Sequence, residues 1–510
     1  MPLLLADLSA VDYTTVVCYF IGMLWLGYHL SRRQKDTEEF FVAGRNMPSW
    51  AAGLSIFATL LSTIAYLYIP GEIIKHGIGQ MASLLAIPFL YVAVGYLIIP
   101  YFMRQRGTSA YEYLEARFGL TARLLAATVF LSIRLTWMGM VVFTASMAMT
   151  EIIGVPERYT WAVALALGVV AIVYTTMGGL RAVIWTDVVQ VLILFGGAVF
   201  TVAYVAFDTG TGPITWLRDT QSAVEQRAPQ PLWSWDPFTR VSYGGVVIQM
   251  FFFWACTAAS DQVAIARYFS TPSTEAARRS FGHTMIANVF LIIVLGLCGM
   301  ALFSFYQTEL PTGPDKVFPY FISHQLPIGI SGLVVAALFS AAMSSLDSGI
   351  SAVATVITVD WYRRLGRGQE NPGRELKLAR VITCVTGMLA VFICIILSWI
   401  PAELRGNLTD MAMQTCTFSV GGLGGLFFIA ILLPGCRSPI ALTSTVLGLA
   451  TGFFLAFGHW MFDLGLDPFG EPRKFSWMWI IPGSAVVTFV VAAVTHGLVS
   501  GLAPSRDVRS

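Results

Sequence analysis

The chain has 510 residues, of which 56% are hydrophobic and 12% are charged, whereas soluble domains average about 45–50% apolar and about 25% charged residues. This composition excludes a soluble multidomain enzyme and is typical of a polytopic membrane protein. The formal net charge of +2 gives no indication of nucleic-acid binding.

Thirteen segments are apolar over about 20 residues, the length that crosses a hydrocarbon core of ~30 Å. We therefore predict an all-α protein with about 13 transmembrane helices. The first segment lacks a charged n-region and a small-residue cleavage site, so we expect it to stay in the mature protein. The predicted spans are 11–31, 48–70, 80–103, 122–151, 159–177, 182–207, 242–268, 283–307, 329–361, 378–400, 408–434, 439–459 and 476–502.

The loops between these spans carry an uneven distribution of positive charge. Most of the 31 Lys and Arg residues fall on one side if the N-terminus is outside, and cytoplasmic loops retain the larger share of such residues. We predict a multi-pass protein of the inner (plasma) membrane, with its N-terminus outside and its C-terminus in the cytoplasm. The seven cysteines have neither zinc-ligand nor redox spacing.

The segment "AALFSAAMSSLDSGISAVAT" (336–355) combines an apolar span with a polar stripe. At about 100° per residue, its serines and Asp347 fall on one helix face. Serines in membranes often serve helix packing, but a mid-membrane carboxylate normally marks an ion or proton path. The combined pattern favours a cation site.

A hard cation needs several oxygens, and backbone carbonyls can supply them only where a helix is broken. The span 48–70 contains Pro70-Gly71, and the span 242–268 is interrupted by "TAASDQ". Each opens a set of five spans, as an inverted five-helix repeat requires. Plain kinks are the alternative interpretation.

Four motifs run through most of the chain: "FFVAGRNMPSWAAGLSIFAT" (40–59), "GGLRAVIWTDVVQVLILFGG" (178–197), "SDQVAIARYFST" (260–271) and "SAAMSSLDSGISAVATVITVDWY" (340–362). With them the chain resembles the sodium/solute symporter family, which includes sodium-coupled glucose, proline, sialic acid and monocarboxylate transporters. The resemblance implies one transporter domain (1–510) with a LeuT-like core and discontinuous first and sixth core helices. Its parts are an extra helix (11–31), two five-helix repeats (48–207 and 242–434) and two C-terminal helices (439–502).

The resemblance also implies how the coupling ion, Na⁺, is bound. Its expected ligands are three backbone carbonyls and two hydroxyls, from Ala58, Leu61, Ala341, Ser344 and Ser345. In some members a second cation site lies nearby, and the matching positions here are Asp187, Asp347 and Ser348. Alternatively, Asp187 is an interfacial carboxylate, and Asp347 carries a proton or pairs with an arginine.

Arg134, in "FLSIRLTWMGMVVF", is the one Lys or Arg that we place well inside a span, away from its ends. It either clamps a solute carboxylate, pairs with Asp187 or Asp347, or snorkels to the membrane boundary. Sugar-carrying members place Asn and Gln at positions that hold Leu60 and Ala65 here, which weakens the case for a sugar.

Other residues that we expect near a solute are Thr63, Tyr66, Trp254, Thr257, Asn288 and Gln414. Gln414 matches a substrate-contacting glutamine of sugar-carrying members, whereas core packing is the alternative for the aromatics. We predict a sodium-coupled symporter that imports a small organic anion, such as a monocarboxylate or a sialate-like acid. A sodium/sugar or polyol symporter is the alternative, with an ion channel or a fused-sensor relative more remote. The sequence has no catalytic motif, so we predict no enzyme.

Overall fold

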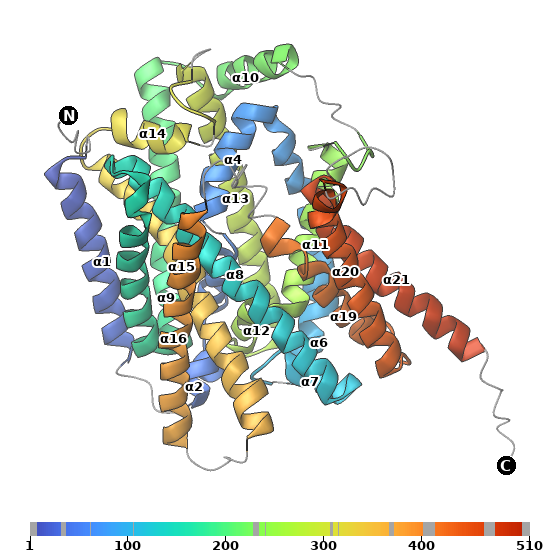
Figure 1. The fold of residues 1–510 in the computed structure, drawn as a ribbon. Coiled ribbons are helices and arrows are strands. Elements are labelled where there is room, and N and C mark those ends of the chain that lie inside the picture. Colours follow the sequence, from blue (N-terminus) through green and yellow to red (C-terminus); the bar gives the residue numbers. More distant parts are fainter. Residues whose placement is uncertain are drawn as a thin grey trace, which may run out of the picture.

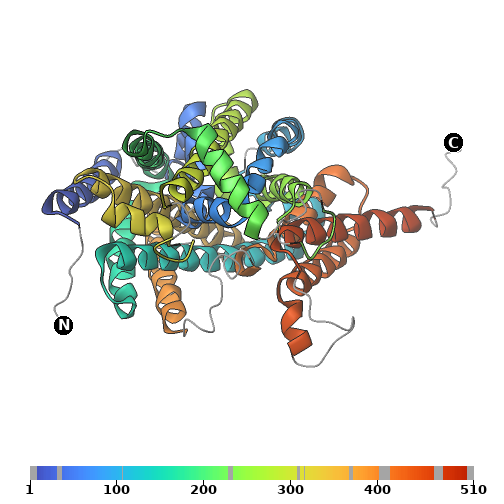
Figure 2. The same cartoon turned by 90° about the horizontal axis from the view of Figure 1, so that it is seen from above.

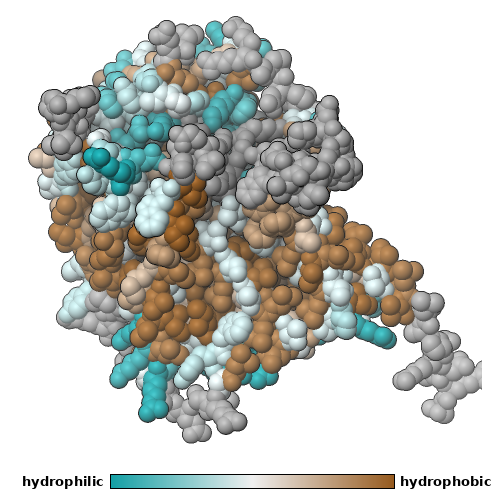
Figure 3. All heavy atoms as spheres, in the orientation of Figure 1, coloured by the Kyte–Doolittle hydropathy of each residue, from teal (hydrophilic) through white to brown (hydrophobic). Residues whose placement is uncertain are grey.

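A computed structural model of the chain describes residues 8–31, 37–61, 63–105, 107–227, 234–239, 241–306, 310–314, 316–366, 372–400, 414–463 and 475–501. Within these ranges every regular element is a helix, which confirms the prediction of an all-α protein. The surface carries a broad apolar belt between two more hydrophilic ends (Figure 3), as a protein that spans a bilayer requires.

Twelve helical segments of the described chain are long and apolar enough to cross a membrane. The prediction of a multi-pass membrane protein is confirmed, but the count of thirteen is not. The difference arises in the predicted span 48–70, because a break after Leu60 divides it into two shorter helices.

The elements of the first half of the chain, shown in Figure 1, follow the predicted spans with short additional helices between them. They are α1 (Ala10–Ser31), α2 (Thr37–Val42), η1 (Ala43–Arg45), α3 (Ser49–Leu60), α4 (Thr63–His76), η2 (Gly77–Ala86), α5 (Ile87–Val92), η3 (Ala93–Ile98), α6 (Ile99–Met103), α7 (Tyr111–Phe118), α8 (Leu120–Ile153), η4 (Glu157–Tyr159), α9 (Thr160–Thr209) and α10 (Pro213–Arg227).

The second half contains α11 (Tyr243–Ser260), α12 (Gln262–Phe269), α13 (Thr274–Tyr306), α14 (Val317–His324), α15 (Ile330–Val356), η5 (Ile357–Arg363), α16 (Pro372–Trp399), α19 (Val420–Leu432), α20 (Ser438–Asp463), η6 (Trp477–Trp479) and α21 (Ile480–Gly501). The start of the predicted span 408–434 lies outside the described residues.

Helix α9 combines the predicted spans 159–177 and 182–207. Gly179 separates them, with φ 54° and ψ −166°, a conformation that residues with a Cβ rarely adopt. The chain therefore turns from one span directly into the next without a loop.

Helix α15 lies at the centre of the molecule, where nearly every side chain from Ser331 to Val356 is buried. It packs against α1, α3, α8 and α9, while α1 and α21 lie at opposite edges of the fold (Figures 1 and 2). The polar stripe of α15 therefore faces protein and not lipid.

Candidate functional site

Two helix breaks have nearly the same backbone geometry. Leu61, after α3, has φ −87° and ψ 119°, and Asp261, between α11 and α12, has φ −88° and ψ 117°. Both residues donate their N–H to the carbonyl four residues earlier, at 2.9 Å. Each break frees backbone carbonyls in the interior, where an ion or solute can use them.

The first break faces the serine stripe of α15. The Ser344 hydroxyl lies 3.0 Å from the carbonyl oxygen of Ala58 and 3.3 Å from that of Ala341. The Ser345 hydroxyl lies 3.1 Å from the carbonyl oxygen of Leu61. The structure thus brings the five predicted sodium ligands together in one cluster, which we call the five-oxygen site.

This cluster has the chemistry that a sodium ion requires. All five oxygens are neutral, and Ser344 and Ser345 are at most 1% exposed. Each hydroxyl can turn its proton away from a carbonyl and present a lone pair to a cation. Hard cations of this kind bind through several oxygens, so these residues fit sodium.

The residues predicted for a second cation are only partly brought together. Asp187 Oδ2 lies 3.4 Å from the Ser348 hydroxyl, but the Asp347 carboxylate accepts a hydrogen bond from Tyr174 instead. Arg267 forms an ion pair with Asp187, with 3.2 Å between Nη2 and Oδ2. Asp187 is therefore a buried, paired carboxylate and not an interfacial one.

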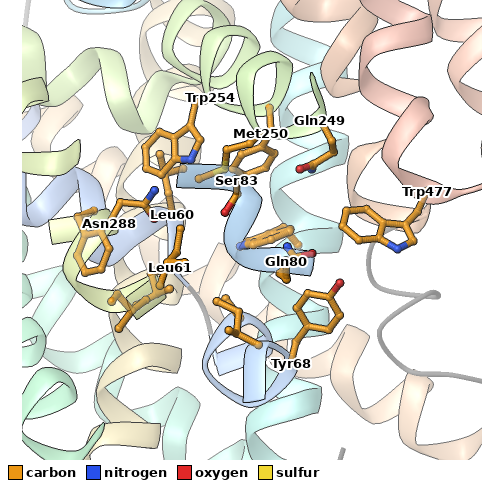
Figure 4. Close-up of a pocket in the computed structure, with 17 residues that line it drawn as sticks. Leu60, Leu61, Tyr68, Gln80, Ser83, Gln249, Met250, Trp254, Asn288 and Trp477 are labelled. Atoms are coloured by element: carbon orange, nitrogen blue, oxygen red, sulfur yellow. The ribbon is translucent and has the colours of Figure 1, made fainter. Parts of the chain in front are cut away.

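A cavity of about 130 Å³ lies beside the first break. Leu60, Leu61 and Ala65 form part of its wall, and Trp254 and Asn288 lie on one side, with Tyr68 and Trp477 on the other (Figure 4). Further polar contributors are Gln80, Ser83, Trp137 and Gln249. None of the described residues that line this cavity has a charged side chain.

Four polar atoms around this cavity are buried without a hydrogen-bond partner in the described chain. They are the indole N–H groups of Trp137 and Trp477, the Nδ2 of Asn288 and the Oε1 of Gln80. Buried polar groups are normally paired, so these three donors and one acceptor are suited to a polar ligand.

Arg134 lies in a smaller adjoining cavity of about 30 Å³, with Thr257 and Asp261. It is 3% exposed and forms an ion pair with Asp261, so neither Asp187 nor Asp347 is its partner, and it does not snorkel to the boundary. Asp261 also accepts a hydrogen bond from the N–H of Val263, at 2.8 Å. The pair links α8 to the second break.

The other expected solute residues lie elsewhere. Thr63 donates to the carbonyl of Leu338, and Tyr66 to that of Leu194, each at 3.3 Å. Gln414 is buried, at 6% exposure, and belongs to neither cavity. Thr63 and Tyr66 hold α4 against its neighbours.

The sequence interpretation missed several residues of the larger cavity. Gln80 and Ser83 lie on η2, which follows the first broken helix, and Trp477 lies far along the chain on η6. It also gave no role in the site to Arg267, which is 1% exposed. The position of Arg267 within "SDQVAIARYFST", only six residues beyond the break, was the available signal.

A family model for sodium:solute symporters matches residues 40–448. The chain belongs to the sodium:solute symporter family. It is therefore a membrane transporter and not an enzyme, and its coupling ion is sodium.

This symporter has relatives that it matches over most of their length. It is 30% identical to the sodium/sialic acid symporter SiaT of Proteus mirabilis, over 87% of this chain and 89% of the relative. It is 29% identical to the human sodium-coupled monocarboxylate transporter 1, over 83% of this chain and 69% of that transporter.

Solved structures support the same fold for the symporter. A substrate-bound, outward-open sialic acid symporter superposes with a TM-score of 0.82 at 26% identity, covering 96% of this chain and 98% of that one. The nucleobase-cation symporter Mhp1 has a TM-score of 0.55 at 12% identity, over 91% of this chain and 95% of that one, which shows a shared fold alone. The predicted LeuT-like core is confirmed.

Proposed function

We propose that this symporter imports a small organic anion together with sodium bound at the five-oxygen site. The observation that carries the proposal is the double role of Leu61. Its carbonyl belongs to the five-oxygen site, while its side chain lines the solute cavity. Movement at this one residue therefore affects the ion and the solute together, which is the physical requirement for coupling.

Arg134 supports a carboxylate on the solute. A guanidinium has five N–H donors, and the described chain supplies Arg134 with one hydrogen-bond acceptor, Asp261. The remaining donors lie in the small cavity that shares Leu60 and Trp137 with the larger one. A solute whose body fills the larger cavity can reach Arg134 with a carboxylate. Relatives that carry sialic acid and monocarboxylates agree with this chemistry.

A sugar or polyol is the second candidate. Gln80, Gln249 and Asn288 supply amide groups to the cavity wall, and uncharged amides and indoles suit hydroxyl groups. Leu60 and Ala65 are apolar members of the same wall, which reduces the number of hydroxyls that the cavity can satisfy. A solute that combines hydroxyls with a carboxylate uses both cavities.

We also propose that the protein lies in the plasma membrane with its N-terminus outside, because this orientation puts most Lys and Arg in cytoplasmic loops. We further propose that the chain forms one transporter domain with an extra helix (11–31), repeats at 48–207 and 242–434, and two C-terminal helices (439–502). The matching torsions of Leu61 and Asp261 support these repeats, since each residue lies in the first span of its repeat.

The proposal is tested with the purified protein in liposomes, under an inward sodium gradient. Uptake of radiolabelled sialic acid, lactate, glucose and myo-inositol is measured against an equal choline gradient. We expect saturable, sodium-dependent uptake of an acid, reduced by Asn288→Ala and retained in Ser351→Ala, a buried serine of α15 away from the cavity. Uptake that is indifferent to sodium contradicts the proposal, and sodium-driven uptake of the neutral sugars alone favours the second candidate.

A further inference from the structure

Arg267 extends into the place predicted for a second cation. Its Nη2 donates to both Asp187 Oδ2 and the hydroxyl of Ser348. Its Nε donates to Ser55 at 2.8 Å, and its Nη1 to the carbonyl of Val263 at 2.9 Å. Because Arg267 is 1% exposed and Asp187 is fully buried, both charges of this pair are enclosed by protein.

The hydroxyl of Ser348 is already held by protein groups. A hydroxyl has one proton and two lone pairs. Ser348 accepts a hydrogen bond from Arg267, and its own proton lies toward Asp187. The Thr59 hydroxyl lies 2.8 Å from Ser348 and 2.8 Å from the carbonyl of Ser55, and its one proton is shared between them. At most one lone pair of Ser348 is therefore open to a metal ion.

The two carboxylates do not make up for this loss. Asp187 Oδ2 already faces Ser55, Arg267 and Ser348, so only its Oδ1 lacks a partner in the described chain. Asp347 is held by the hydroxyl of Tyr174. Asp347 Oδ1 also lacks a partner in the described chain. Two carboxylate oxygens beside the positive charge of Arg267 still fall short of a sodium site, since such cations need several oxygens. The residues predicted for the second cation therefore do not fit a sodium ion.

We propose that the guanidinium of Arg267 is a resident cation that replaces a second sodium between Asp187 and Ser348. The inference rests on the proposed function, because it takes the five-oxygen site as the place of the coupling ion. Unlike a bound sodium, this charge cannot leave with the solute. Asp187 thus neutralises Arg267 and positions it against α3, α9 and α15 without contributing to the number of ions transported.

The test counts sodium ions bound to the detergent-solubilised full chain without solute, with ²²Na⁺ as the probe. The parent is compared with Asp187→Asn, Arg267→Gln and the charge-neutral double variant. We expect Asp187→Asn and the double variant to bind the same number of ions as the parent. Arg267→Gln should gain one ion, because Asp187 and Ser348 then become available. A purely structural role for Arg267 predicts no gain.

The results separate this inference from the proposed function. Loss of one sodium ion in Asp187→Asn, or the absence of a gain in Arg267→Gln, overturns the inference and leaves the five-oxygen site intact. A parent that binds no sodium overturns the proposed function and the inference with it. If a single variant leaves an unpaired buried charge and does not fold, the double variant still decides, because a count below that of the parent contradicts the inference.

Discussion

Removing both hydroxyls of the five-oxygen site is the sharpest test of its role. The double variant Ser344→Ala with Ser345→Ala removes two of the five oxygens and retains the three backbone carbonyls. Alanine favours a helix interior, so α15 should form. The carbonyls of Ala58 and Leu61 lose their hydroxyl donors, which reduces stability by about 1–2 kcal/mol for each.

The expected effect on sodium binding is much larger. A hydrogen bond or equivalent polar contact to a charged group contributes about 1.5–3 kcal/mol. The loss of two such contacts amounts to about 3–6 kcal/mol. Water can enter from the neighbouring cavity and replace part of this loss, since Leu61 belongs to both. We therefore expect the lower value, which raises the half-saturating sodium concentration on the order of 100-fold.

Sodium-dependent uptake into liposomes measures this change, and thermal unfolding verifies that the variant is folded. Ser351→Ala is the matched control, because Ser351 is a buried serine two turns along the same helix and lies outside the five-oxygen site. If the double variant keeps the sodium dependence of the parent, the two serines serve packing alone and the assigned ion site is wrong.

Three further predictions concern other parts of the molecule. Arg134→Lys keeps the charge but loses the planar guanidinium, so the KM for an acidic solute should rise roughly ten-fold with sodium binding unchanged. An equal loss of sodium affinity would indicate that Arg134 serves only to pair with Asp261. Gly332→Ala places a Cβ 2.7 Å from backbone atoms of Asp12 and should cost about 1–3 kcal/mol in thermal unfolding, while Gly22→Ala meets no atom within 4 Å and should not. Hydrogen bonds from Arg364 and Arg123 hold the pKa of Glu115 below its ordinary 4.5, so the stability that ionised Glu115 contributes is present above pH 4.5 and is lost as pH falls through the lower folded-state pKa. Glu115→Gln should remove this acid-sensitive part of the unfolding free energy, and an unchanged pH profile of stability would contradict the prediction.

The fold was largely predictable because its main determinants are local. Apolar length locates the spans, and the polar interruption "TAASDQ" indicates the break at Asp261. The predicted number of spans was not confirmed, because Leu61 has an extended conformation within an otherwise continuous apolar stretch. The join at Gly179 likewise depends on one backbone conformation that composition does not report.

From residue spacing alone, the candidate site was predictable only where its residues lie on one helix, whereas Ala58 and Leu61 were expected from the family resemblance. Ser344 and Ser345 are adjacent on α15, and helical periodicity places them with the rest of the stripe. The partners of Arg134 and Arg267 come from helices far away in sequence, so spacing cannot identify them. The roles of all these residues stay predictions until ion binding and uptake are measured.

The two helix breaks differ in the groups that neutralise the partial charges of their helix ends. A helix carries a partial negative charge at its C-terminal end and a partial positive charge at its N-terminal end, and each break brings one end of each kind together. At the second break, Asp261 caps the N-terminus of α12 and pairs with Arg134. These charges belong to side chains and therefore cannot dissociate from the protein.

At the first break, the side chains of the described chain that donate to the carbonyls at the end of α3 are the uncharged hydroxyls of Ser344 and Ser345. Three of the five oxygens there belong to the main chain, and two of these, from Ala58 and Leu61, lie at the C-terminal end of α3, so backbone dipoles can attract a cation there without a carboxylate. We expect such a neutral site to hold a cation less tightly than a site with a carboxylate ligand would. The second break is thus neutralised by charged side chains of the protein, whereas the first break leaves room for a charge that can bind and dissociate.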